Sequence, residues 1–200
     1  LTDKKLSETP FLSSGIGGIL HIASSYSRRF EEVILQVPKG RSLKGINVST
    51  NRGQTTIINA SLENATLHTN GYLLRIEGSR IKNSKFKTPN IINIFDTDLT
   101  DSQLESTKNH FYVDNIKVYG KVELTSKNEL SITLTQKESQ EINLDLSSHY
   151  GPIYQLSRDE SQHHPNELSN PYKTEKTDVK GQLIARAEDY ISLETTANKP

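Results

Sequence analysis

The amino-acid sequence predicts a mainly β protein, a right-handed parallel β-helix, and two observations carry this prediction. Apolar side chains recur in runs with a five-residue spacing, at Ile57, Leu62, Leu67, Ile76, Ile81, Phe86, Ile91, Leu99 and Leu104. A small residue stands two positions before most of them, at Thr55, Ala60, Ala65, Ser79, Ser84, Thr97 and Ser102. Neither an amphipathic helix nor an alternating strand has this period. A narrow solenoid does, and the spacing suggests coils with four five-residue sides.

The composition agrees with a thin core. Hydrophobic residues make up 32% of the 200 residues, and the mean hydropathy is -0.62. A solenoid needs few apolar residues, because each side of a coil buries only a narrow stripe. Lys plus Arg equals Asp plus Glu at 24 each, so the chain lacks the basic field of a nucleic-acid binder. Cysteine is absent, which excludes disulfides and thiol chemistry.

Residues 1–38 are expected to form a helical N-terminal cap. Ser7 and Thr9 before Pro10 are typical of a helix start. Apolar residues then follow at helical spacing, at Ile16, Ile19, Leu20, Ala23 and Tyr26. A cap of this kind would cover the unpaired strand groups at the open end of a solenoid.

Residues 40–146 are expected to form the β-helix, with irregular final strands. From residue 108 the period changes to alternation, with Leu130, Ile132 and Leu134 as one example and Ile142, Leu144 and Leu146 as another. These strands would form either a small antiparallel cap or the last coils. No segment has the roughly 20 apolar residues of a membrane span.

Residues 147–200 are expected to be an extended polar segment with a short C-terminal helix. Pro152, Pro165 and Pro171 interrupt a stretch that is poor in apolar residues. The helix is predicted from the spacing of Leu183, Ile184, Ala187, Tyr190 and Ile191. Because the chain begins at Leu1 and lacks Met, we expect a piece of a longer protein.

The five-residue pattern resembles the pentapeptide-repeat family. Matching units are Ala60-Ser-Leu-Glu-Asn, Ala65-Thr-Leu-His-Thr, Ser79-Arg-Ile-Lys-Asn, Ser84-Lys-Phe-Lys-Thr, Thr97-Asp-Leu-Thr-Asp and Ser102-Gln-Leu-Glu-Ser. They cover about a third of the chain and are interrupted at 70–75 and 92–96. The composition is also similar to the β-helix domains of bacterial type III secreted effectors. That resemblance implies a virulence-associated module, secreted and acting inside a host cell, with a protein partner.

We therefore expect a non-enzymatic protein-interaction module that needs no cofactor and binds no nucleic acid. Its oligomeric state is left open. Two alternatives remain: a β-helix carbohydrate-binding or carbohydrate-active protein, and a structural fibre component. The carbohydrate alternative predicts aromatic residues aligned along one face, for which Tyr72, Phe95 and Tyr112 have roughly the right spacing.

No catalytic, cofactor or metal residues are assigned, and one surface patch is considered. It consists of Arg75, Arg80, Lys82, Lys85 and Lys87. The repeat would place these residues around one coil and not on one face. Pairing with carboxylates of the next coil, such as Lys85 with Glu105, is favoured over an anion site. Asp96, Asp98 and Asp101 are interpreted as solvated turn residues, and His163-His164 as part of a solvated loop.

Overall fold

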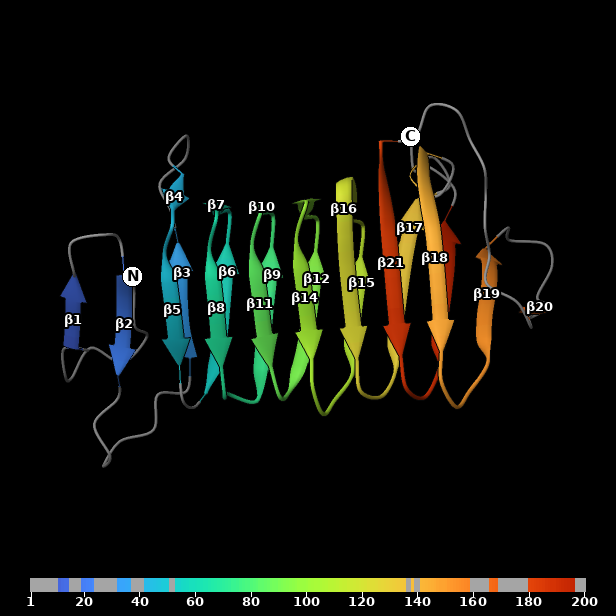
Figure 1. Cartoon of the computed structure of the whole chain (residues 1–200), viewed down its shortest axis with the longest axis horizontal. Helices are drawn as coiled ribbons and strands as arrows, with labels where there is room; N and C mark the ends of the chain where they lie inside the picture. Colours follow the sequence, from blue (N-terminus) through green and yellow to red (C-terminus); the bar gives the residue numbers. More distant parts are fainter. Residues whose placement is uncertain are drawn as a thin grey trace.

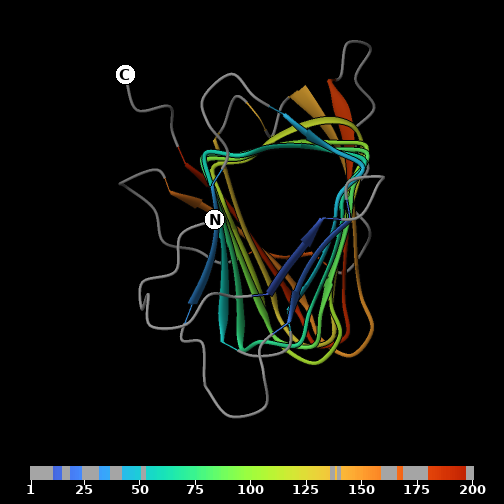
Figure 2. The same ribbon diagram turned by 90° about the vertical axis from the view of Figure 1, so that its left-hand side faces the viewer.

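The computed structural model is a parallel β-solenoid with three flat faces (Figure 1 and Figure 2). It describes residues 11–14, 19–23, 32–36, 42–50, 53–135, 138, 141–158, 166–168 and 180–196. The predicted class, a mainly β protein with a parallel solenoid, is confirmed. Seen along its axis, the described chain winds around three sides that enclose the core (Figure 2).

We name the three faces A, B and C. Face A contains, in spatial order, β3 (Glu32–Gln36), β6 (Gln54–Ile58), β9 (Leu73–Glu77), β12 (Ile91–Phe95), β15 (Phe111–Asp114), β17 (Leu130–Thr135), β22 (Ile191–Thr196), β19 (Ile153–Arg158) and β20 (Asn166–Leu168). Face B contains β1 (Phe11–Ser14), β2 (Ile19–Ala23), β5 (Asn47–Thr50), β8 (Thr66–Thr69), β11 (Lys85–Thr88), β14 (Gln103–Ser106), β16 (Lys117–Ser126), β21 (Gly181–Ala187) and β18 (Ile142–Ser148). Face C contains β4 (Leu43–Lys44), β7 (Ser61–Glu63), β10 (Arg80–Lys82), β13 (Asp98–Thr100) and the beginning of β16.

The strand register shows that the expected four-sided coil is wrong. Ile81 pairs with Leu62, nineteen residues earlier, and with Leu99, eighteen residues later. A coil of this length has three sides, with short turns before faces C and B and a wider turn before face A. The two short turns produce the five-residue spacing. The wide turn produces the nine-residue step from Leu67 to Ile76, which a pentapeptide repeat does not explain.

The short turns depend on residues with a left-handed backbone. Their φ angles lie between 47° and 62°, a region that Gly, Asn and Asp tolerate best. One column of these residues joins face A to face C and consists of Asn59, Gly78, Asp96 and Asn115. The other joins face C to face B and consists of Gly45, Asn64, Asn83, Asp101 and Gly120. Their amides bond to the next coil, as from Asn64 N to the Lys82 carbonyl at 3.0 Å.

Four of the small residues that follow these turns, Ser79, Ser84, Thr97 and Ser102, are buried, and their hydroxyls bond to the backbone. The Ser84 hydroxyl donates to the Lys82 carbonyl at 2.7 Å and accepts the amide of Ala65 from the preceding coil at 3.0 Å. Thr97 and Ser102 donate in the same way to the carbonyls two residues before them. These bonds satisfy polar groups that would otherwise be buried unpaired. The sequence position that must be small therefore also benefits from being Ser or Thr.

The N-terminal helix predicted for residues 1–38 is wrong where the structure describes that segment. The segment contains β1, β2 and β3, and β1 pairs antiparallel with β2. β2 then pairs in parallel with β5, which places Leu20 beside Val48. The apolar pattern of 19–23 fits either period, and pairing with the solenoid decides in favour of a strand.

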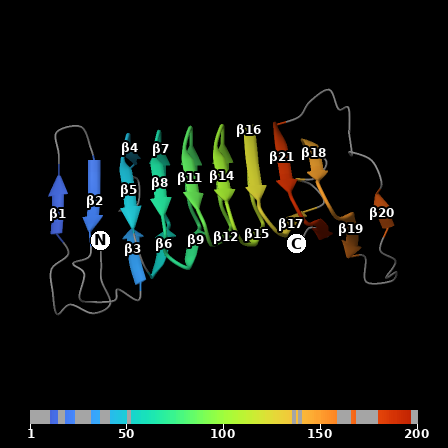
Figure 3. The same ribbon diagram turned by 60° about the horizontal axis from the view of Figure 1, so that its bottom comes forward.

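The C-terminal helix predicted around 183–191 is also wrong, because this segment forms β21 and β22. β21 lies between β16 and β18 (Figure 1 and Figure 3). β22 lies between β17 and β19. The last coil in the sequence is therefore inserted between two earlier coils, and we call it the inserted coil. Its Leu183 and Ile191 are fully buried. Its residues form strands although their apolar spacing fits a helix, because each strand pairs in parallel with a neighbour on both sides.

The strands predicted for 130–134 and 142–146 are confirmed as β17 and β18, and both pair in parallel. The described residues include no helix with the length and hydropathy that crossing a membrane requires.

Candidate binding surfaces

The five basic residues of the predicted patch lie on three faces of one coil. Arg75 is on β9 of face A, Arg80 and Lys82 are on β10 of face C, and Lys85 and Lys87 are on β11 of face B. They do not form a single cationic surface.

Most of these side chains are paired with acidic residues. Arg80 lies 3.5 Å from Asp98, and Lys82 lies 3.6 Å from Glu63. Glu105 pairs with Lys87 at 2.8 Å and not with Lys85, because the coil is eighteen residues long at this point. Exposed pairs of this kind contribute at most about 1 kcal/mol each.

Glu63 forms ion pairs with a lysine of the preceding coil and a lysine of the following coil. Its carboxylate lies 2.8 Å from Lys44 and also contacts Lys82, so it bridges two coils on face C. The hydrogen bond from Lys44 lowers the pKa of the Glu63 carboxyl. Both carboxylates on the strands of face C, Glu63 and Asp98, are therefore engaged by cations, and Lys117 adds a further positive charge to this face.

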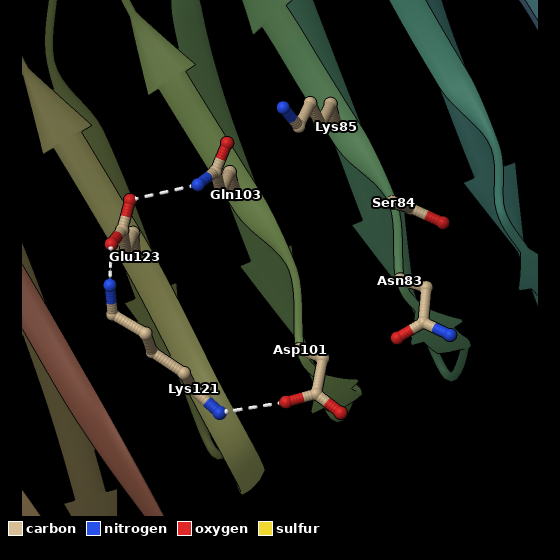
Figure 4. A pocket seen from close by; sticks show the side chains of 7 residues that line it. All are labelled: Asn83, Ser84, Lys85, Asp101, Gln103, Lys121 and Glu123. Carbon is tan, nitrogen blue, oxygen red and sulfur yellow. Dashed lines mark hydrogen bonds and ion pairs between the residues drawn. The ribbon is translucent and has the colours of Figure 1, made fainter.

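Lys85 is the member of the patch that has no carboxylate partner among the described residues. It lines a shallow depression of about 320 Å³ on face B together with Asn83, Ser84, Asp101, Gln103, Lys121 and Glu123 (Figure 4). Most of the polar groups in this depression bind one another. Glu123 lies 2.6 Å from Lys121 and accepts a hydrogen bond from Gln103 at 3.0 Å, and the hydrogen bond from Lys121 lowers the pKa of Glu123. The depression is best described as a polar network between coils.

Asp96, Asp98 and Asp101, which the sequence suggested were solvated turn residues, have structural roles. Asp96 and Asp101 are corner residues with φ near 47°, and Asp101 accepts the backbone amide of Lys121 at 3.0 Å. Asp98 pairs with Arg80. Across the described residues, no three His, Asp or Glu side chains converge on a point that could hold a metal ion. His163-His164 lies outside the described residues.

The outer surface of face A differs from the other two faces. Its first half carries four partly buried apolar side chains, Ile58, Leu73, Ile91 and Phe95, which we call the apolar patch. Leu73 and Ile91 are direct neighbours on β9 and β12. By contrast, the outward positions of β8, β11 and β14 on face B are all polar: Thr66, His68, Lys85, Lys87, Gln103 and Glu105.

Arg75 lies between the two apolar pairs of the patch, and Glu77 lies between Ile58 and Phe95. The Arg75 guanidinium lies 5.3 Å from the centre of the Phe95 ring, a cation–π contact, and 2.8 Å from Glu77. Arg beside aromatic and aliphatic groups is the combination enriched in protein–protein interfaces.

The second half of face A carries a different group, which we call the aromatic platform. It consists of Tyr112, Tyr154 and Tyr190 with His110 and Glu129. Tyr190 and Tyr154 meet edge to face at 6.0 Å, and the His110 ring lies 6.2 Å from the Tyr112 ring. Glu129 lies 3.5 Å from His110, and its hydrogen bond with Tyr190 raises the pKa of Tyr190 to about 12. Burial, with a smaller effect of Glu129, raises the pKa of Tyr112.

The predicted alignment of Tyr72, Phe95 and Tyr112 does not occur. Phe95 pairs with Asp114, two positions beyond Tyr112, and Tyr72 precedes β9. Tyr112 instead shares a row with Ser131, Ser192 and Tyr154. Sequence spacing could not reveal this row, because β22, the last of these strands in the sequence, lies between the strand of Ser131 and the strand of Tyr154.

A family model described as Toastrack DUF4097 matches residues 1–194. The chain belongs to this family. The match extends from the N-terminal strands into the inserted coil, so the Toastrack domain includes both segments that the sequence had suggested were helical. No curated protein and no solved structure matches the chain.

Proposed function

We propose that this Toastrack domain is a non-enzymatic protein-interaction module and that its apolar patch contacts the partner. The observation that carries the proposal is the contrast between the faces. Four partly buried apolar side chains gather on the first half of face A, while the compared strands of face B present only polar groups outward. Leu73 with Ile91 and Ile58 with Phe95 lie on either side of a polar row that contains Arg75. Apolar and aromatic groups beside an arginine are typical of protein–protein interfaces.

The shape of the solenoid supports the same proposal. β9 and β12 are each paired in parallel on both sides, so Leu73, Ile91 and Arg75 occupy set positions on a rigid surface. Little conformational entropy is lost when such a surface binds. A partner chain would cover Leu73 and Ile91 and place a carboxylate or a backbone carbonyl near Arg75.

We also propose, as a more specific version of this function, that the module is secreted and is the β-helix part of a bacterial effector. The support for both statements is the Asn-, Ser- and Thr-rich composition and the interrupted five-residue repeat. They remain predictions about where the module acts.

Site-specific photocrosslinking tests the interaction. A photoreactive side chain at Ile91 on face A is compared with one at Thr66 on face B, both in the intact chain incubated with cell extract. We expect one protein to crosslink at Ile91 and not at Thr66. Excess unlabelled chain should compete for it, and a chain with Leu73→Lys and Ile91→Lys should not.

Three outcomes would contradict the proposal. They are equal crosslinking at both positions, no crosslink at Ile91 that unlabelled chain suppresses, and competition that survives the double substitution. A crosslink of the chain to itself would assign face A to self-association instead.

A further inference from the structure

We infer that the aromatic platform is a binding site for a neutral oligosaccharide, separate from the apolar patch. The row from Tyr112 to Tyr154 crosses three inter-strand spacings, which is about 14 Å. The two positions between the tyrosines are Ser131 and Ser192, both small and both only partly buried. The row therefore has an aromatic ring at each end and a low, hydroxyl-bearing floor between them.

This arrangement suits the two kinds of surface on a sugar ring. The flat face of a pyranose presents C–H groups, which the negative face of a tyrosine ring attracts. Tyr112 is 39% exposed, so part of its ring is available for such a contact. The edge of a pyranose presents hydroxyls, which both donate and accept hydrogen bonds.

Polar groups for those hydroxyls lie beside the tyrosines. Glu129 offers carboxylate acceptors next to His110 and Tyr190. Asn93 pairs with Tyr112 across the strands, and its Oδ1 is buried without a hydrogen-bond partner in the described structure. A buried acceptor without a partner is costly, and turning the Asn93 side chain outward onto a ligand hydroxyl would satisfy it.

The charge of this region selects the kind of sugar. The outward positions around the platform include the carboxylates of Asp114, Glu129 and Glu194. The outward residues of β15, β17 and β22 include no Lys or Arg. The basic residue of β19, Arg158, is four residues from Tyr154, at the other end of that strand. Uronic or sulfated sugars would be repelled, and a neutral chain would not.

The length of the row selects the size of the ligand. A span of about 14 Å is too long for one sugar ring to contact both tyrosines. A short oligosaccharide can stack on Tyr112 with one unit and on Tyr154 with another. The affinity should therefore rise steeply from a monosaccharide to an oligosaccharide, as for two linked contacts.

Calorimetric titration of the whole chain tests this inference. The probes are cellohexaose, maltohexaose and chitohexaose, with glucose and hexagalacturonate for comparison. We expect at least one neutral hexasaccharide to bind with a Kd of roughly 1 mM or tighter, and glucose and hexagalacturonate to bind more weakly. Absence of binding by all three neutral hexasaccharides would overturn the inference, as would preference for hexagalacturonate.

Variants locate the binding. Tyr112→Ala and Tyr154→Ala should each weaken the affinity roughly tenfold, because each removes one stacking ring. Tyr112→Phe, which keeps the ring, should stay close to the parent chain, and it serves if an alanine variant is unstable. Tyr72→Ala is the matched control, since Tyr72 is 59% exposed and lies outside the platform. An effect of Tyr72→Ala equal to that of Tyr112→Ala would contradict the assignment.

One further variant separates this inference from the proposed function. Leu73→Lys with Ile91→Lys should leave the affinity for the hexasaccharide unchanged while removing the protein contact. Loss of both together would show that face A is a single site and would overturn the separation made here.

Discussion

The inserted coil makes a sharp prediction, and Leu183→Ala tests it. Leu183 is fully buried on β21 and pairs with Val122 of β16 on one side and Leu144 of β18 on the other. Removing such a side chain from a packed core costs 2 to 5 kcal/mol, as an order of magnitude, because a cavity remains. That is a large part of the 5 to 15 kcal/mol that typically stabilises a domain, again as an order of magnitude.

The location of the loss is more informative than its size. Within the described structure, β18 pairs with β21 and with no other strand. When β21 opens, β18 loses its attachment to the solenoid. Hydrogen exchange of the amides in β18 should therefore accelerate together with that of β21. At a cost of about 2 kcal/mol the acceleration is roughly 30-fold.

Leu67→Ala is the matched control. Leu67 is 2% exposed and lies on β8, between β5 and β11 in an ordinary coil. Leu67→Ala should accelerate hydrogen exchange around β8. The exchange rates of β18 and β21 relative to each other should stay as they are in the parent chain. Hydrogen exchange read by mass spectrometry resolves both regions. Fast exchange in β21 with a protected β18 in the Leu183→Ala chain would refute the insertion.

Two other predictions concern a corner and a titration. Asn83→Ala should lower the free energy of unfolding in urea by about 1 kcal/mol, because φ is 48° at this residue. Asn83→Gly should lower it little, since glycine adopts this φ freely. Equal losses for the two variants would contradict the role of the left-handed backbone. The pKa of Tyr190 is raised in the folded chain to about 12, so its stabilising contribution is complete below pH 10 and is lost as the pH rises towards 12. In a pH titration, Tyr190→Phe should remove the phenolate absorbance that appears at the highest pH. It should also reduce the loss of unfolding free energy between pH 10 and pH 12. An unchanged titration would show that another tyrosine has the raised pKa.

The middle of the chain was predictable because its signal is local. Each coil repeats one apolar and one small residue per short side, and the corners at Asn64 and Asn83 are occupied by a residue type that favours turns. The number of sides was not predicted correctly. The nine-residue step from Leu67 to Ile76 contained that information, but it was interpreted as an interruption of a four-sided repeat.

The two ends were not predictable from spacing alone. Leu183, Ile184 and Ala187 fit a helix as well as a strand, and only contact with β16 and β18 decides between them. The aromatic platform depends on the same long-range event, since Tyr154 reaches the row of Tyr112 only because β22 lies between β17 and β19. The apolar patch needed the register as well, because the outward positions are known only once the strands are aligned.

The inserted coil also sets an order of folding. A chain synthesised as far as Arg158 contains β16 and β18 but lacks β21, so the facing edges of these two strands have no partner. Val122 and Leu144 both pair with Leu183, so they would lie opposite each other if β16 and β18 paired directly. Such direct pairing would compete with the native arrangement and would have to open before β21 could enter. This end of the solenoid is therefore completed by intercalation of its last strands, a non-local step that is slow compared with adding one coil after another.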